Sequence, residues 1–201
     1  MLKRIFDSVC SLIGLVLLAP LLTAIGICIA LESKGGVFYR QVRVGRFGKE
    51  FYLYKFRTMH PDADKKGLLT VGGRDPRITG IGYYLRKFKL DELPQLLNVL
   101  NGSMSLVGPR PEVKKYVDLY TPEQRKVLSA RPGITDYASL EYFSENELLA
   151  ESNDPEKTYI EEIMPAKLEL NKKYINEAGL VTDLGILFRT LFKVLGLSSR
   201  H

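Results

Sequence analysis

Two adjacent carboxylates in the middle of the chain, Asp91 and Glu92, are surrounded by the residue types that phosphate chemistry uses. Arg86 precedes the pair, and Arg110 follows it in the sequence Gly-Pro-Arg-Pro. The prolines hold Arg110 in a stiff backbone, and an Arg side chain can bind two phosphate oxygens at once. A carboxylate beside fixed cations can attack or bind a phosphoryl group, so this segment predicts a phosphoryl-transfer site.

A helical pattern follows the acidic pair. Pro94 suits the first turn of a helix, and apolar residues recur at helical spacing at Leu93, Leu96, Leu97 and Leu100. The exposed N–H groups at a helix N-terminus favour carboxylates and phosphates alike. Two interpretations of Asp91 therefore stay open at this stage: it takes part in chemistry, or it only caps the helix.

The bulk composition narrows the classes of partner. The chain has 201 residues, enough for one domain with a core and an appendage, and a net charge of +6. Such a charge favours anions: nucleic acid, acidic lipid or a phosphorylated substrate. The two cysteines lie in an apolar stretch and the two histidines form no zinc spacing, so neither a disulfide framework nor a zinc site is indicated. No nucleic-acid motif is present, and a basic membrane-anchored module is the non-enzymatic alternative.

An uncharged apolar run from residue 9 to residue 31 is long enough to cross a bilayer as one helix. Lys3 and Arg4 precede it, and a lysine and several arginines follow, so the positive-inside tendency places both ends on the cytoplasmic face. Pro20, near the middle, removes a backbone hydrogen bond. A re-entrant helix that bends at Pro20 satisfies both observations, while a plain spanning helix is the alternative. Asp7 is expected to pair with Arg4 at the interface.

Alternating residues after this run predict a β-hairpin, with strands over 37–44 and 51–56 joined by a turn. Lys55 and Arg57 lie on one face at its end and either bind phosphate or form a solvated edge. Residues 61–73 are polar and Gly-rich and form a loop that could cover a site. Arg77 either reaches phosphate or pairs with Asp75.

Helical patterns dominate the last third of the chain. Before this third of the chain, Thr79 is the candidate N-terminal cap of a separate helix that begins near Ile81. Residues 144–172 are rich in Glu, which is typical of a solvated helix face. Residues 180–197 repeat Leu and Phe at helical spacing with cations between them, so they form either core or an in-plane interfacial helix.

These patterns together predict an α+β fold that is predominantly helical. We expect a monotopic membrane protein with a re-entrant helix over residues 1–33 that is broken at Pro20. A cytoplasmic catalytic domain over residues 34–201 carries the β-hairpin and membrane-contacting amphipathic helices.

Several ordered motifs are similar to those of one known family. They are Lys3-Arg4-x-x-Asp7, Pro20, Gln41-x-Arg43-x-Gly45, Lys55-Phe56-Arg57-Thr58-Met59, Asp75-Pro76-Arg77-Ile78-Thr79, Leu90-Asp91-Glu92-Leu93-Pro94-Gln95-Leu96, Met104-Ser105-Leu106-Val107-Gly108-Pro109-Arg110-Pro111 and Arg131-Pro132-Gly133-Ile134-Thr135. With them, nearly the whole chain resembles the bacterial sugar transferase family, the monotopic phosphoglycosyl transferases, in the small single-domain form.

The resemblance implies transfer of a sugar phosphate from a UDP-sugar to polyprenyl (undecaprenyl) phosphate, with release of UMP, at the start of membrane-bound glycan assembly. It implies a ping-pong mechanism with the phospho-sugar bound covalently to Asp91, Glu92 as catalytic partner and Mg²⁺ held by Asp91 and Glu92. The expected phosphate-binding residues are Arg86, Arg110 and Arg131, and more weakly Lys55, Arg57 and Arg77.

The implied location is the cytoplasmic face of the bacterial inner membrane, with membrane lipid as a partner and no nucleic acid. The oligomeric state stays open, a homodimer included. A transferase that moves the sugar without its phosphate, and so releases UDP, is the competing enzyme.

One segment departs from the family pattern. After Pro-Gly-Ile-Thr many members continue Gly-Trp-Ala-Gln, whereas this chain continues with Asp136, Tyr137, Ala138 and Ser139. The departure leaves the identity of the sugar open, while the chemistry is unaffected.

Overall fold

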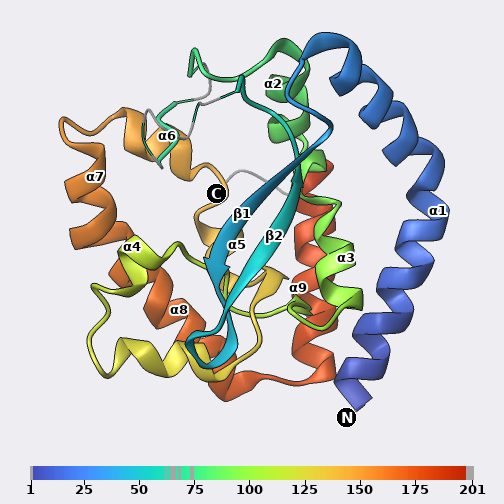
Figure 1. Cartoon of the computed structure of the whole chain (residues 1–201). Coiled ribbons are helices and arrows are strands. Elements are labelled where there is room, and N and C mark those ends of the chain that lie inside the picture. Colours follow the sequence, from blue (N-terminus) through green and yellow to red (C-terminus); the bar gives the residue numbers. More distant parts are fainter. Residues whose placement is uncertain (1, 62, 64–66, 68, 73–74, 198–201) are drawn as a thin grey trace.

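A β-hairpin lies at the front of the molecule, and helices surround it on both sides (Figure 1). The computed structural model describes residues 2–61, 63, 67, 69–72 and 75–197. The predominantly helical α+β prediction is confirmed, since most of the described elements are helices.

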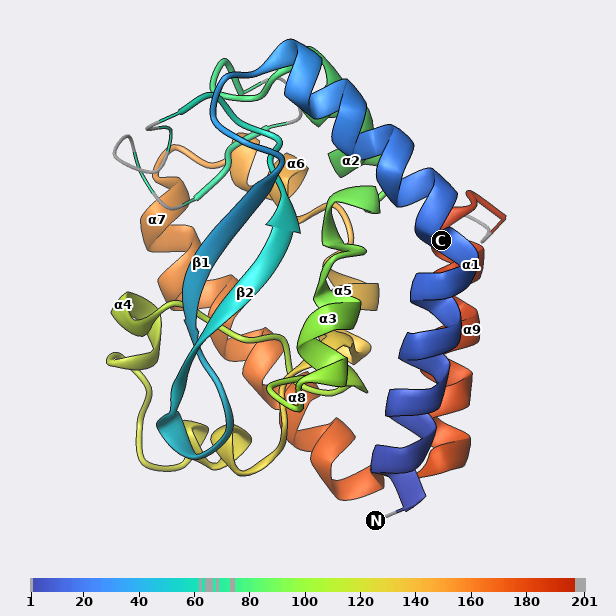
Figure 2. The ribbon, with the colours of Figure 1, turned by 45° about the vertical axis from the view of Figure 1, so that its right-hand side comes forward.

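The N-terminal helix α1 (Leu2–Glu32) follows one edge of the molecule (Figure 1). Its axis bends part-way along (Figure 2), and Pro20 lies inside it, which is the usual cause of a helix kink. Most of its apolar side chains are exposed, among them Val16 and Leu17. In the described part of the chain, α1 alone is long and apolar enough to cross a membrane, as judged by length and composition.

Both ends of α1 are fixed to the rest of the molecule. At the start, Lys3 pairs with Asp183, and Arg4 donates to the carbonyl oxygens of Val99 and Leu100. The predicted pairing of Arg4 with Asp7 was therefore wrong, because free carbonyls at a helix end take the guanidinium.

The buried Asp7 instead accepts a hydrogen bond of 2.6 Å from the Ser105 hydroxyl. At the far end of α1, Ile25 and Ile29 form an apolar cluster with Phe56 and Leu85. The polar and apolar contacts together hold α1 against the domain that carries the acidic pair.

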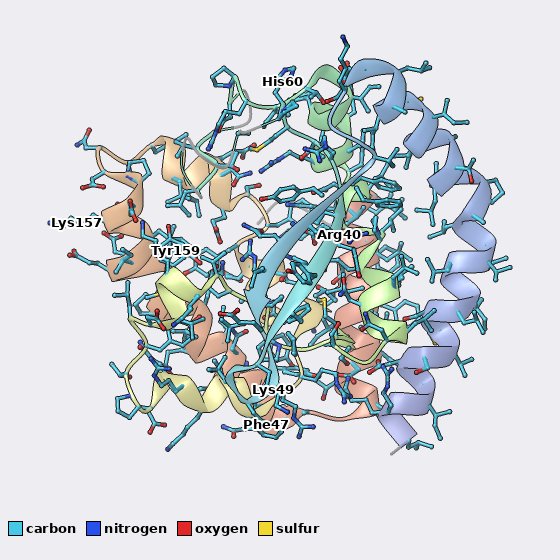
Figure 3. All side chains as sticks on the ribbon, in the orientation of Figure 1. Arg40, Phe47, Lys49, His60, Lys157 and Tyr159 are labelled. Carbon is cyan, nitrogen blue, oxygen red and sulfur yellow. The ribbon has the colours of Figure 1, made fainter. Side chains whose placement is uncertain are left out.

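The hairpin consists of β1 (Phe38–Val44) and β2 (Glu50–Phe56), which pair antiparallel. Their turn, η1 (Arg46–Gly48), places Phe47 at φ 59° and Gly48 at φ 75°, and the tip carries Phe47 and Lys49 (Figure 3). The predicted hairpin is confirmed, with its turn at the expected place.

A second, shorter sheet pairs β3 (Ser105–Val107) with β4 (Gly133–Thr135) in parallel. Two glycines make this pairing possible, because a Cβ at Gly133 would overlap the backbone of Gly108, and one at Gly108 would overlap the Arg131 carbonyl. The sheet thereby fixes the backbone that leads directly into Arg110.

The remaining helices enclose these sheets. Before β3 come α2 (Gly80–Lys87), η3 (Leu90–Glu92) and α3 (Gln95–Leu100). Between β3 and β4 come α4 (Lys114–Val117) and η4 (Gln124–Ser129). After β4 come α5 (Tyr137–Glu141), α6 (Glu145–Ala150), α7 (Pro155–Thr158), η5 (Tyr159–Ile163), α8 (Met164–Glu177) and α9 (Leu180–Val194). The predicted cap of α2 is confirmed, since the Thr79 hydroxyl accepts from the Gly82 amide.

The acidic segment over residues 144–172 does more than present a solvated face. Its inner side supplies Leu149, Tyr159, Ile163 and Leu168 to one apolar core. The earlier interpretation missed this side because the many Glu residues between the apolar positions hide their helical spacing.

Helix α9 keeps a largely exposed apolar face. Val181, Phe188 and Phe192 are exposed, whereas Asp183 and Ile186 are buried on the opposite side. The sequence allowed two interpretations of residues 180–197, a core helix or an in-plane interfacial helix. The description as core applies only to the buried side of α9. In Figure 2, α9 lies behind α1 on the same side of the molecule.

Candidate active site

The acidic pair lies on the short 3₁₀ turn η3, before the helix that the sequence predicts it to begin. Helix α3 starts only at Gln95, with Pro94 at its cap and no side-chain capping bond. The interpretation of Asp91 as a helix cap is therefore not what the structure shows. Lys89, just before η3, is in the left-handed region (φ 55°), which is rare for a residue with a side chain. Such backbone conformations cluster at functional sites.

Asp91 is almost fully buried, with 7% of its surface exposed. Within the described residues, its carboxylate accepts no hydrogen bond and forms no ion pair closer than 4.0 Å. Burial raises the pKa of Asp91 above its ordinary value, and the charges of Lys55 and Arg86 offset this only in part. A buried carboxylate that has no partner among the described residues can accept one from a bound substrate or ion.

Glu92 has the opposite environment. Lys55 Nζ donates to its Oε1 at 2.9 Å, and Arg110 binds both of its oxygens, with Nη1 3.0 Å from Oε2. Burial raises the pKa of Glu92, but Arg110 and Lys55 outweigh burial and hold that pKa well below its usual range. The two neighbouring carboxyl groups therefore differ: Glu92 is a fixed anion, and Asp91 is the more readily protonated.

Arg110 is positioned through its backbone as well as its side chain. Its amide donates to Asp136 Oδ2 at 3.2 Å, while Asp136 Oδ1 accepts from the Ser139 amide and caps α5. The fully buried Asp136 therefore ties the loop after β3 to the start of α5. Sequence reasoning did not identify this residue, although the departure from the family pattern at this position was a signal.

Two further cations lie in the field of the acidic pair. Burial lowers the pKa of Arg86, while the charge of Asp91 opposes that shift, and its Nη2 donates to the Thr70 hydroxyl at 2.8 Å. Burial also lowers the pKa of Lys89, whose ammonium lies 4.8 Å from the centre of the Phe143 ring.

Of the predicted site residues, the structure thus brings Lys55, Arg86 and Arg110 together with the acidic pair. Three other cations lie elsewhere. Arg57 donates to the Gly36 carbonyl at 2.9 Å, in the segment before β1. Arg131 lies in the field of Arg4, Arg46 and Asp7, none of which belongs to the acidic-pair cluster.

Arg77 is occupied by the loop around it. It pairs with both oxygens of Asp75 and donates to the carbonyls of Gly67 and Leu69 at 2.7 and 2.6 Å. Of the two predicted alternatives, pairing with Asp75 is the one observed. Hydrogen bonds from Arg77 lower the pKa of Asp75.

A cavity of about 160 Å³ lies beside Arg110. Residues of the hairpin and of the acidic segment line it, among them Arg43 of β1, Asn146 of α6 and Asn171 of α8. Leu69 and Thr70 also line it, so the loop predicted to cover a site does border a cavity.

Comparison with known proteins agrees with the motifs. A family model described as bacterial sugar transferase matches residues 1–197. The chain belongs to the bacterial sugar transferase family. The resemblance inferred from the ordered motifs is thereby confirmed.

Three relatives illustrate the match. The chain is 45% identical over 122 residues to a putative undecaprenyl-phosphate N-acetylgalactosaminyl 1-phosphate transferase of Bacillus subtilis (strain 168), covering 61% of this chain and 68% of the relative. It is 38% identical over 194 residues to an uncharacterized sugar transferase of the same strain, covering 96% and 87%. It is 37% identical over 196 residues to the UDP-glucose:undecaprenyl-phosphate glucose-1-phosphate transferase of Caulobacter vibrioides, covering 96% and 69%.

The family motifs that are distant in sequence meet at this site. Lys55 comes from the end of β2, the acidic pair from η3, and Arg110 from the segment after β3. The Pro132–Thr135 motif acts indirectly, since β4 pairs with β3 and fixes the approach to Arg110.

The Mg²⁺ that the family implies fits one carboxylate of the pair better than the other. Asp91 offers a hard oxygen ligand that forms no ion pair with the described residues, and Mg²⁺ in phosphate-binding sites is typically held by one or two carboxylates together with substrate oxygens. Both oxygens of Glu92 are already bound by cations. No group of three or more metal-ligating side chains occurs among the described residues, so phosphate and water would complete the shell.

Proposed function

We propose that the protein transfers a sugar phosphate from a UDP-sugar to undecaprenyl phosphate, with Asp91 as a covalent nucleophile. The observation that carries the proposal is the buried carboxylate of Asp91, which has no ion-pair partner among the described residues, beside a Glu92 that holds two cations. The names of two relatives support the reaction class, since each is named as a transferase for undecaprenyl phosphate.

In the first step, a carboxylate oxygen of Asp91 forms a bond to the β-phosphorus of the donor. The bond from that phosphorus to the bridging oxygen breaks, and UMP leaves with the electron pair. Lys55 and Arg110 offset the charge of the diphosphate, since both face the oxygens of the neighbouring Glu92. Mg²⁺, when bound, would offset further charge on the phosphates and favour the ionised form of Asp91.

In the second step, a phosphate oxygen of undecaprenyl phosphate attacks the same phosphorus. The bond to Asp91 breaks, and the carboxylate is restored. Glu92 acts in both steps as a positioning residue, because its pKa is held too low for proton transfer near neutral pH. Its role is to keep Lys55 and Arg110 directed at the phosphate.

The second substrate is a membrane lipid, so we propose that the site works at a bilayer surface. The exposed apolar side chains of α1 and of α9 support this, because soluble surfaces rarely leave such large apolar faces uncovered. We propose that α1 is re-entrant and bent at Pro20, with the catalytic part on the cytoplasmic face. The bend of α1 in Figure 2 is consistent with that arrangement.

The test is incubation of the purified protein with a panel of UDP-sugars, undecaprenyl phosphate and Mg²⁺, followed by separation of nucleotides. We expect UMP, dependence on the divalent cation and loss of product after Asp91→Asn. Release of UDP would instead identify a transferase that moves the sugar alone. If the protein only binds anionic vesicles, in a salt-dependent way that Asp91→Asn does not change, it is the non-enzymatic module.

A further inference from the structure

The cavity beside Arg110 has room for one ring. Its volume is about 160 Å³, and an engineered protein cavity of about 150 Å³ holds one benzene molecule. Arg110 connects it to the acidic pair, since this residue lines the cavity and its side chain binds Glu92. Thr70, another lining residue, accepts a hydrogen bond from Arg86.

The walls of this cavity are polar and charged. Among the lining residues, Glu145 pairs with Lys167 at 2.6 Å, and Glu112 pairs with Arg43 at 3.0 Å and accepts from the Tyr159 hydroxyl. Paired side chains of this kind offer both hydrogen-bond donors and acceptors, which a ligand rich in hydroxyl groups requires.

One lining side chain has an unused hydrogen-bonding atom. Asn171 is only 5% exposed, and its Oδ1 is buried without a hydrogen-bond partner among the described residues. A buried acceptor without a partner is costly in a folded protein. Because Oδ1 itself is covered by protein atoms, the Asn171 amide must turn toward the cavity before a donor of a ligand can reach this oxygen. An O–H or N–H group of a bound ring would satisfy it.

The backbone at the cavity is unusual as well. Tyr159, a lining residue, begins the π-helical turn η5, and such turns are frequent at functional sites. In Figure 3 Tyr159 lies on the inner side of this region, whereas the exposed Lys157 lies on its outer side. The Tyr159 side chain is buried at this turn.

We propose that this cavity binds the sugar ring of the UDP-sugar and that Asn171 contributes to the choice of sugar, an inference that rests on the proposed function. The sugar oxygen is bonded to the phosphorus that Asp91 attacks, whereas the uracil lies beyond a second phosphate and a ribose. A one-ring cavity that shares Arg110 with the acidic pair is therefore placed for the sugar.

The test compares Asn171→Leu with Asn176→Leu, the same exchange at an exposed position of α8. Initial rates are measured with UDP-glucose, UDP-N-acetylglucosamine and UDP-N-acetylgalactosamine, together with inhibition by UMP and the thermal midpoint.

We expect Asn171→Leu to lower kcat/KM for the preferred donor by about tenfold, the value of one hydrogen bond, and to change the ratio of kcat/KM between donors. Inhibition by UMP should change less than about twofold. The thermal midpoint should not fall, since the exchange removes a buried unsatisfied atom. The control should match the wild type throughout.

An equal loss with every donor, together with weaker inhibition by UMP, would overturn the proposal and assign the cavity to the uridine. Unchanged donor ratios and a lowered thermal midpoint would make Asn171 a structural residue and also overturn it. If Asn171→Leu does not fold, Asn146→Ala tests the same cavity, because the Asn146 backbone carbonyl keeps its bond to the Gly72 amide.

The proposed function has a separate outcome. If the wild type releases UMP from none of the donors, the reaction is wrong, and calorimetric titration with the same UDP-sugars still tests the cavity. Donor binding that is weakened only by the cavity variants would then support a sugar-binding site, and equal binding by wild type and variants would overturn it.

Discussion

Replacement of Glu92 by Gln tests whether this residue is the electrostatic centre of the site. The side chain keeps its shape but loses its charge, so Lys55 and Arg110 lose the anion that they share. Lys55 and Glu92 have only 18% and 13% of their side-chain surface exposed, and Arg110 has 33%. The perturbation therefore leaves two poorly solvated cations side by side.

The expected loss of stability follows from this geometry. Breaking a buried ion pair costs about 3–5 kcal/mol, and the amide oxygen of Gln keeps part of the hydrogen bonding, so we take about 3 kcal/mol. For a chain of 201 residues, 1 kcal/mol corresponds to about 2–4 °C in thermal midpoint, which predicts a fall of about 6–12 °C. Because the pKa of Glu92 is lowered in the folded protein, its contribution is present above the unfolded pKa and is lost only as pH falls through the lowered one. The loss in Glu92→Gln should therefore be constant from about pH 6 to pH 8.

Circular dichroism in detergent or in nanodiscs suits the measurement, since the chain has no tryptophan. The matched control is Asp118→Asn, at an exposed ion pair. The side chain of Asp118 is 54% exposed, and that of its partner Lys114 is 63% exposed. An exposed ion pair contributes about 0.3–0.5 kcal/mol, so the control should shift the midpoint by no more than about 2 °C. The double variant Glu92→Gln/Lys55→Met should recover part of the loss, because one unpaired cation is gone.

A midpoint for Glu92→Gln within about 2 °C of the wild type would refute the reasoning. The reasoning would also be refuted if the double variant lost more thermal stability than the two single variants lose when their losses are added. Either result would mean that the cations are solvated in the folded protein and that Glu92 does not position them.

Three further predictions concern the residues around the pair. Asp91→Asn should abolish turnover yet raise the thermal midpoint at pH 8, because the pKa of Asp91 is raised in the folded protein and its ionised form therefore costs stability. This gain in thermal midpoint should shrink as the pH falls and Asp91 becomes protonated, and a midpoint below that of the wild type at pH 8 would contradict the prediction. Asp136→Ala should lower the free energy of unfolding by about 1–2 kcal/mol through the lost α5 cap, and it should lower kcat/KM by misplacing Arg110, whereas Asp136→Asn should keep both the stability and the kcat/KM of the wild type. Chemical denaturation and initial rates measure these two quantities. Gly133→Ala should yield little folded protein, with a cost of about 3 kcal/mol or more, because its Cβ meets the Gly108 backbone; soluble yield after membrane extraction measures it.

Local patterns were sufficient for the elements that depend on neighbours in sequence. The alternation over 37–56 predicted the hairpin, and Thr79 before a helical run predicted the cap of α2. The start of α3 was misplaced because Pro94 is compatible with both a first helical turn and a preceding 3₁₀ turn. The left-handed conformation of Lys89, just before η3, has no sequence signature.

The site was predictable in its chemistry but only partly in its membership. Lys55 and Arg57 are two residues apart, yet only Lys55 contacts Glu92, because Arg57 follows the end of β2 and bonds to Gly36. Arg131 is the first residue of a family motif, but its side chain lies in the field of Arg4 and Arg46. Long-range packing decides which basic side chains lie near the acidic pair. The spacing of these residues in the sequence carries no information on that packing.

Neither the cavity nor the Asn171 oxygen, which has no hydrogen-bond partner in the described part of the chain, could be predicted at all. The apolar spacing that shapes this wall, including Leu168 and Tyr159, is interrupted by glutamates and by a π turn that shifts the helical phase. Only a structure shows that Asn171 and Arg110 line the same space.

The most direct test of the account is to mix the protein with a UDP-sugar and Mg²⁺ without undecaprenyl phosphate, quench it in acid and determine the mass of the intact chain and of its peptides. The account predicts a burst of about one UMP per chain and a sugar phosphate attached to Asp91, both absent in Asp91→Asn. An adduct on another residue, or UMP that forms only when undecaprenyl phosphate is present, would contradict it.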